Sequence, residues 1–203
     1  MRFSPLALIP YLAMILGLHV FQSAWIAFVI YHGLILVSLL GSKDRTFWAE
    51  LICGWDWKLG LGAVVFGLGG GVVLYFLAPM AGVNKTMIEP IISRLGLQGI
   101  SWLIFVWYHS LVNPWFEEIL WRGKLGSKNS RPVLNDLLFA GYHLLVLVLF
   151  LDWIWMALAV VLLTLAGWLW RQMRQRNGGL LLPVISHMAA DASIMVVVYY
   201  ISR

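Results

Sequence analysis

Three short motifs place ionisable side chains in otherwise apolar sequence, and a spacing of four residues recurs in each of them. The motifs are Glu117-Glu118 with Arg122, Phe139 with His143, and His187 with Asp191. Residues four apart lie on the same face of an α-helix, so each motif would present its side chains together. Carboxylates and imidazoles are common acids and bases in enzymes. We therefore take these residues as the candidate catalytic centre.

Composition places this centre inside a membrane. Of 203 residues, 62% are hydrophobic, whereas soluble domains have roughly 45–50%, and the mean hydropathy is +0.87. Several apolar stretches approach the roughly 20 residues that span a bilayer as a helix, without the alternation of barrel strands. The chain is therefore expected to be all-α, a polytopic transmembrane helical bundle. Ionisable groups are costly inside such spans, which makes the three motifs candidates for function.

Charge and cysteine content exclude other classes. The net charge is +5, but the basic residues form short clusters between apolar spans, which indicates membrane topology and not a nucleic-acid partner. The single Cys53 excludes an intrachain disulfide and a cysteine-based zinc site.

We predict seven spans in one integral membrane domain, residues 1–203. They cover about 5–19, 22–40, 58–78, 98–122, 135–151, 153–171 and 180–201. The first two share a long apolar block, and the break between them is weakly marked. The third contains Gly67 and Gly71, a GxxxG pair that predicts close packing against another helix.

Basic residues between the spans predict the orientation. Eleven lysines and arginines fall on one side and three on the other, so the first side should be cytoplasmic. The three motifs then lie at similar depth in the cytoplasmic half of the fourth, fifth and seventh helices. Because such groups avoid lipid, we expect them to converge on one cavity that opens to the cytoplasm.

The motifs resemble those of a known family. Residues 113–123 contain Glu117-Glu118-Ile119-Leu120-Trp121-Arg122 and are similar to the EExxxR motif of the CPBP family, the CAAX prenyl endopeptidases and bacteriocin-processing proteins. Phe139-Ala140-Gly141-Tyr142-His143 resembles its FxxxH motif, and His187-Met188-Ala189-Ala190-Asp191 its HxxxN/D motif. The order is also the family's. The resemblance implies a glutamate-type intramembrane endopeptidase with no metal or cofactor, acting on a peptide or protein substrate within the bilayer.

Peptide hydrolysis suggests a role for each residue. Glu117 is the candidate base, because burial makes a carboxylate a better proton acceptor, and His143 would steady the attacking water. Glu118 is expected to pair with Arg122 in a supporting role. Phe139 is expected to pack below the site.

His187 and Asp191 would form the oxyanion side of the site. The family often carries an amide at the last position, and an ionised Asp191 would repel an oxyanion. We therefore expect Asp191 to orient His187 and keep it protonated as the donor. His19, His32 and His109 are expected to hydrogen-bond between helices, with His109 bordering the cavity. Asn113 and Pro114 are expected to kink the fourth span.

Two alternatives remain open. A zinc protease could use several of the same residues as ligands, although no HExxH motif is present: Glu117, Glu118, His143, His187 and Asp191. A non-catalytic carrier or immunity protein could also bury carboxylates and histidines. We expect localisation in a bacterial inner membrane. The sequence predicts neither the substrate nor the oligomeric state.

Overall fold

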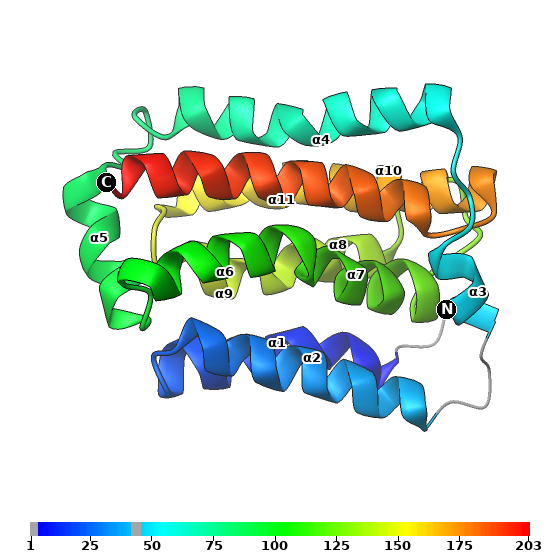
Figure 1. Cartoon of the computed structure of the whole chain (residues 1–203), viewed down its shortest axis with the longest axis horizontal. Coiled ribbons are helices and arrows are strands. Elements are labelled where there is room, and N and C mark those ends of the chain that lie inside the picture. Colours follow the sequence, from blue (N-terminus) through cyan, green and yellow to red (C-terminus); the bar gives the residue numbers. More distant parts are fainter. Residues whose placement is uncertain (1–3, 42–45) are drawn as a thin grey trace.

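The computed structural model describes residues 4–41 and 46–203, and this part of the chain is helical with no strand. The helices, in chain order, are η1 (Pro5–Leu8), α1 (Ile9–Met14), η2 (Ile15–Val20), α2 (Ala24–Leu40), α3 (Thr46–Leu51), α4 (Trp57–Leu77), α5 (Lys85–Arg94), α6 (Gly99–Leu111), α7 (Asn113–Glu117), η3 (Glu118–Lys124), α8 (Leu134–Tyr142), α9 (Leu144–Leu147), α10 (Trp153–Asn177) and α11 (Leu181–Ile201). Most run parallel or antiparallel, while α5 crosses one end of the bundle (Figure 1).

The helical bundle predicted from the sequence is confirmed, and helices occupy all seven predicted segments. By length and composition α4, α10 and α11 can each cross a membrane, and a fourth span results if α5 and residues 99–124 count as one span bent by 91°. The remaining apolar helical segments, residues 5–20, 24–40 and 134–147, are shorter. Seven complete spans therefore stay a prediction.

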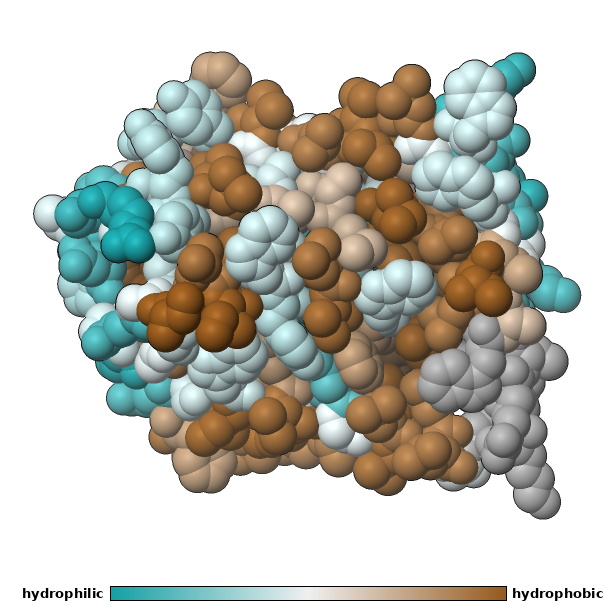
Figure 2. Space-filling view, viewed as in Figure 1, coloured by the Kyte–Doolittle hydropathy of each residue, from teal (hydrophilic) through white to brown (hydrophobic). Residues whose placement is uncertain are grey.

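The surface agrees with a bilayer environment. Figure 2 shows hydrophobic residues across the middle of the bundle and hydrophilic residues gathered at its two ends. Large apolar side chains such as Val29 and Leu61 are exposed by 72% and 65%. A soluble monomer rarely exposes so much contiguous apolar surface, whereas lipid tails cover it without cost. The chain is an integral membrane protein.

The break between the first two helices lies near the predicted position. The π-helical segment η2 ends at Val20, and α2 begins at Ala24. Between them Gln22 has a positive φ of 49°. The hydroxyl of Ser23 accepts a hydrogen bond from the backbone N–H of Ile26 at 3.3 Å and so caps α2.

The glycines of α4 allow that helix to pack closely against α11, with which it runs side by side (Figure 1). A Cβ atom on Gly67 would lie 2.2 Å from the carbonyl oxygen of Ser186, and one on Gly71 would lie 2.5 Å from the Cβ of Ser193. Only glycine permits this approach, so the predicted packing role of the GxxxG pair is confirmed.

The predicted fourth span is not one straight helix. Pro114 lacks the N–H that would bond to the carbonyl of Ser110, so α6 ends at Leu111 and α7 begins at Asn113. After Glu117 the helix widens into the π-helical turn η3. Such turns are uncommon and often occur at functional sites.

A buried arginine connects several elements at the end of the bundle near η3. Arg171 on α10 is 1% exposed and forms two hydrogen bonds to Asp136 on α8, with lengths of 2.9 and 2.7 Å. Its guanidinium also donates to the backbone carbonyls of three residues in the loop between η3 and α8, namely Ser127, Asn129 and Arg131. This one side chain therefore ties α8, α10 and the loop together.

Candidate active site

The structure brings residues of all three motifs into one buried cluster. Glu117 ends α7, Glu118 and Arg122 lie in η3, and His187 and Asp191 lie on α11. Their exposed fractions range from 0% to 8%. The motif of Phe139 and His143 borders the cluster through Phe139, whose ring centroid lies 6.1 Å from that of His187. Convergence at this point is what the sequence led us to expect.

Two donors hold one oxygen of Glu117. The amide of Asn113 donates to Oε1 at 2.7 Å, and the hydroxyl of Tyr142 donates to the same oxygen at 2.5 Å. Oε2 is buried and has no hydrogen-bond partner among the described residues. The nearest ionisable partner of Oε2 is His187, whose Nε2 lies 3.8 Å away. Glu117 is thus fixed by one oxygen and keeps the other available.

Glu118 fixes the ring of His187. Nδ1 of His187 lies 2.8 Å from Oε1 of Glu118, and a carboxylate only accepts, so Nδ1 carries the hydrogen. The same oxygen lies 3.1 Å from Nη1 of Arg122, which is the expected ion pair. The guanidinium of Arg122 also lies over the rings of Phe139 and Trp170, at 4.0 and 5.1 Å from their centroids.

His143 lies at the break between α8 and α9. Its backbone N–H bonds to the carbonyl of Ala140, so the carbonyl of Phe139 loses its helical partner and instead lies 2.8 Å from Nδ1 of the His143 ring. A carbonyl only accepts, so Nδ1 donates and Nε2 of a neutral ring is an acceptor. The four-residue spacing of this motif therefore sets the tautomer of His143.

Asp191 lies between two histidines. Its Oδ1 is 3.5 Å from Nε2 of His187, and its Oδ2 is 3.2 Å from Nδ1 of His109 on α6. The side chain of His109 is 27% exposed, against 4% for His187. His109 therefore belongs to the rim of the cluster, and its pairing with Asp191 is closer than that of His187.

A comparison with family models identifies this region. Residues 99–193 match the model described as type II CAAX prenyl endopeptidase, Rce1-like. These residues form an Rce1-like domain. The resemblance seen in the motifs is thereby confirmed, and the family is one of membrane proteases. None of the curated proteins or solved structures searched matches the chain.

The Rce1-like domain extends from α6 into α11 and contains every residue of the cluster described above. Outside it, His32 on α2 supports the cluster, since its Nε2 lies 3.2 Å from the side-chain oxygen of Asn113 and its Nδ1 lies 2.9 Å from the hydroxyl of Tyr108. His32 thus hydrogen-bonds between helices, as expected. His19 does so through the carbonyl of Leu145 at 2.7 Å.

Sequence reasoning missed two residues of the Rce1-like domain. Asn113 was assigned only to a kink, although its place four residues before Glu117 repeats the spacing that marked the other motifs. Tyr142 precedes His143 directly, and its neighbourhood is apolar in sequence, so no pattern marked it. Its contact with Glu117 joins residues 25 apart and follows from tertiary packing alone.

The cluster does not have the geometry of a metal centre. In residues 4–41 and 46–203, no group of three histidine, cysteine or carboxylate side chains is placed to hold a metal ion. Arg122 and the Nδ1–H of His187 converge on one oxygen of Glu118. A metal cation bound at that oxygen would therefore lie beside the positively charged guanidinium of Arg122 and be repelled by it.

Proposed function

We propose that this chain is an intramembrane endopeptidase in which Glu117 activates the attacking water. One observation carries the proposal: Oε1 of Glu117 is held by Asn113 and Tyr142, while the buried Oε2 keeps its lone pairs free. A general base needs a fixed orientation and an unoccupied acceptor atom. Glu118 also keeps one oxygen without a partner, but its other oxygen already neutralises Arg122 and holds the ring of His187. Asp191 lies between His109 and His187, with one oxygen near each.

The chemistry uses one proton transfer in each direction. Oε2 of Glu117 would take a proton from water while Nε2 of neutral His143 accepts the other water hydrogen and orients it. The hydroxide attacks the peptide carbonyl carbon, and the carbonyl oxygen becomes an oxyanion. Protonated Glu117 then gives its proton to the leaving amine nitrogen, the C–N bond breaks, and the carboxylate is restored. No metal or other cofactor is required by these steps.

His187 is suited to stabilise the oxyanion. Glu118 holds the ring through Nδ1, which leaves Nε2 facing Glu117 and Asp191 at 3.8 and 3.5 Å. A protonated His187 would then donate from Nε2 to the oxyanion, as an oxyanion-hole donor does. The sequence assigned the orientation of His187 to Asp191, but the shorter contact supports Glu118 in that role. Asp191 instead has His109 beside it, and an imidazolium there would offset its negative charge.

The substrate is a peptide segment within or at the bilayer. The family of membrane proteases supports this general class. We further propose one domain, residues 1–203, in a bacterial inner membrane, with the site open to the cytoplasm. The support is the excess of basic residues at the bundle end that carries η3 and the loop after it.

The test uses purified chain and a panel of fluorogenic peptides in detergent micelles. Glu117→Gln should abolish cleavage with an unchanged Tm, because an amide cannot take the proton. Tyr142→Phe should retain the fold and lose about 10–100-fold in kcat, since a hydrogen bond to a charged group contributes about 1.5–3 kcal/mol. The matched control Asp152→Asn alters a carboxylate at the start of α10, outside the cluster, and should change nothing.

Three results would count against the proposal. Full activity in Glu117→Gln would exclude that residue as the base. Loss of activity with a chelator, restored by zinc, would favour the metal alternative. A folded parent chain that cleaves no peptide in micelles or in vesicles would favour the non-catalytic alternative.

A further inference from the structure

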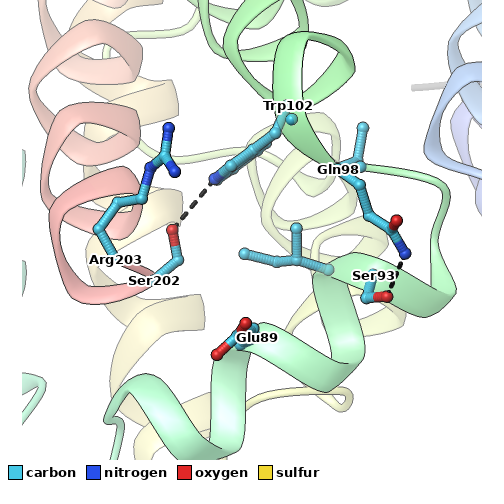
Figure 3. Close-up of a pocket in the computed structure, with 9 residues that line it drawn as sticks. Glu89, Ser93, Gln98, Trp102, Ser202 and Arg203 are labelled. Carbon is cyan, nitrogen blue, oxygen red and sulfur yellow. Dashed lines mark hydrogen bonds between the residues drawn. The ribbon is translucent and has the colours of Figure 1, made fainter.

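A polar cavity lies at the end of the bundle opposite η3. It has a volume of about 390 Å³, within the range of about 300–1,000 Å³ typical of ligand pockets. Helix α5, the start of α6 and the end of α11 enclose it (Figure 3). None of the residues that line it belongs to the cluster around Glu117. The cavity is therefore a separate feature of the chain.

The cavity lies at the depth of lipid headgroups. Helix α11 has 21 residues, about 30 Å at 1.5 Å per residue, which matches the hydrocarbon thickness of a bilayer. Ser202 and Arg203 follow directly and so fall at the interface. Helix α5 lies across this end, bent by 91° from the helical segment of residues 99–124. The bend is possible because Gly96 and Gly99 adopt φ angles of 79° and 50°.

Opposite charges line the cavity from separate elements. Figure 3 shows Glu89 on α5 and Arg203 at the end of α11 on different sides of the cavity. Within the described residues no ion pair joins them. The guanidinium of Arg203 is instead positioned by the hydroxyl of Tyr199, which accepts from its Nη2 at 2.7 Å. Lys85 donates from Nζ to the backbone carbonyl of Arg203 at 2.8 Å, which ties α5 to the end of α11.

The walls of the cavity suit an amphipathic ligand. Trp102 is buried, and its indole N–H donates to the hydroxyl of Ser202 at 3.0 Å, which fixes one wall. Ile92 and Leu97 add apolar surface. Gln98 and Ser93 hydrogen-bond to each other at the opposite side (Figure 3). Tryptophan beside polar groups is typical of the membrane interface.

We propose that this cavity binds the phosphoethanolamine headgroup of a membrane phospholipid. A guanidinium is the preferred partner of a phosphate, and Glu89 can accept from a primary ammonium. A zwitterion satisfies both charges, whereas a purely anionic headgroup leaves Glu89 unmatched. The position at the interface and the apolar wall point to a lipid as the source of this headgroup, with its acyl chains beside the bundle.

Lipid binding to the purified full-length chain can be measured by native mass spectrometry, without any peptide cleavage. Phosphatidylethanolamine should bind at least 10-fold more tightly than phosphatidylglycerol with the same acyl chains. Glu89→Gln should remove this preference, because the ammonium loses its acceptor. Arg203→Gln should weaken both lipids by at least 10-fold. Arg94→Gln is the matched control, since it removes a basic residue of α5 that does not line the cavity, and it should leave both affinities unchanged.

Several outcomes would overturn the proposal. Equal binding of the two lipids by the parent chain would exclude recognition of the ammonium, and an unchanged preference in Glu89→Gln would exclude its assigned acceptor. Soluble O-phosphoethanolamine that binds as tightly as the lipid would exclude the membrane as the source. If Arg203→Gln lowers the Tm, the variant Arg203→Lys is tested in its place. It should keep the affinity for lipid within a few-fold of the parent. A complete loss of lipid binding in Arg203→Lys would count against the phosphate contact. These results do not depend on whether the chain is a protease.

Discussion

The contact between α4 and α11 gives the sharpest prediction, because one methyl group added there should disturb the active site without touching it. A Cβ atom on Gly67 would lie 2.2 Å from the carbonyl oxygen of Ser186 and 2.9 Å from the Cβ of Ala189. Ordinary contact begins at 3.4 Å, so α11 must move by roughly 1 Å to admit the methyl. His187 directly follows Ser186 and would move with it, which would change its contact with Glu118.

The magnitudes follow from that displacement. Overpacking of this kind costs about 1–3 kcal/mol, which lowers the Tm of a chain of this length by roughly 2–12 °C. A displacement of about 1 Å at a catalytic group costs on the order of 100-fold in rate. We therefore expect Gly67→Ala to lose both stability and peptide cleavage. The buried hydroxyl of Ser186, which donates to the carbonyl of Ala63 at 2.8 Å and accepts from Trp170 at 3.0 Å, would be disturbed as well.

Gly69→Ala is the matched control on the same helix. No atom lies within 4 Å of a Cβ atom built on Gly69, and alanine is the better helix former. Its Tm should equal or exceed that of the parent, with unchanged cleavage. Both variants are compared by thermal unfolding and peptide cleavage in the same detergent. Equal Tm values for Gly67→Ala and Gly69→Ala would refute the packing argument, and a lower Tm with full activity would refute its link to His187.

Three further predictions concern buried charge and orientation. Glu118→Gln leaves Arg122 charged and buried without its carboxylate, so the free energy of unfolding should fall by about 3–5 kcal/mol. Adding Arg122→Met should restore much of it, whereas additive losses in denaturant unfolding would argue against the pair. Arg171→Met leaves Asp136 unpaired, so the free energy of unfolding should fall by a similar amount, about 3–5 kcal/mol. The loop after η3 should also be cleaved faster by a protease. An unaltered rate of proteolysis would show that other residues anchor the loop. The exposed Cys53 should react with a membrane-impermeant maleimide only in opened cells, and labelling of intact cells would reverse the predicted orientation.

The sequence predicted the helices because hydrophobic length is a local property. Apolar runs of about 20 residues mark helices in a bilayer whatever their neighbours are. The break near residue 22 and the packing of Gly67 were also predicted from local features, namely polar residues within the first apolar block and two glycines four residues apart. The motif spacing also predicted the ion pair between Glu118 and Arg122, which are one helical turn apart.

Contacts between helices could not be predicted from local sequence patterns. The pairing of His109 with Asp191 joins residues 82 positions apart, and that of Tyr142 with Glu117 joins residues 25 apart. Both depend on how far each helix is rotated about its axis. That rotation is set by packing and by the interruptions in residues 111–118, which a periodic pattern does not report.

The π-helical turn η3 has a consequence for how proteins with these three motifs are counted in genomes. Its hydrogen bonds enclose one residue more than those of an α-helical turn. Deleting Gly123, which follows the last residue of the first motif, would let the turn close as an ordinary α-helix and would move the start of the following loop by one residue, about 100° around the helix axis. Every letter of the three motifs would survive the deletion, yet the loop carbonyls of Ser127 and Asn129 would no longer meet Arg171 as they do here. A chain can therefore keep the full family signature and lose part of the framework around it through a single missing codon.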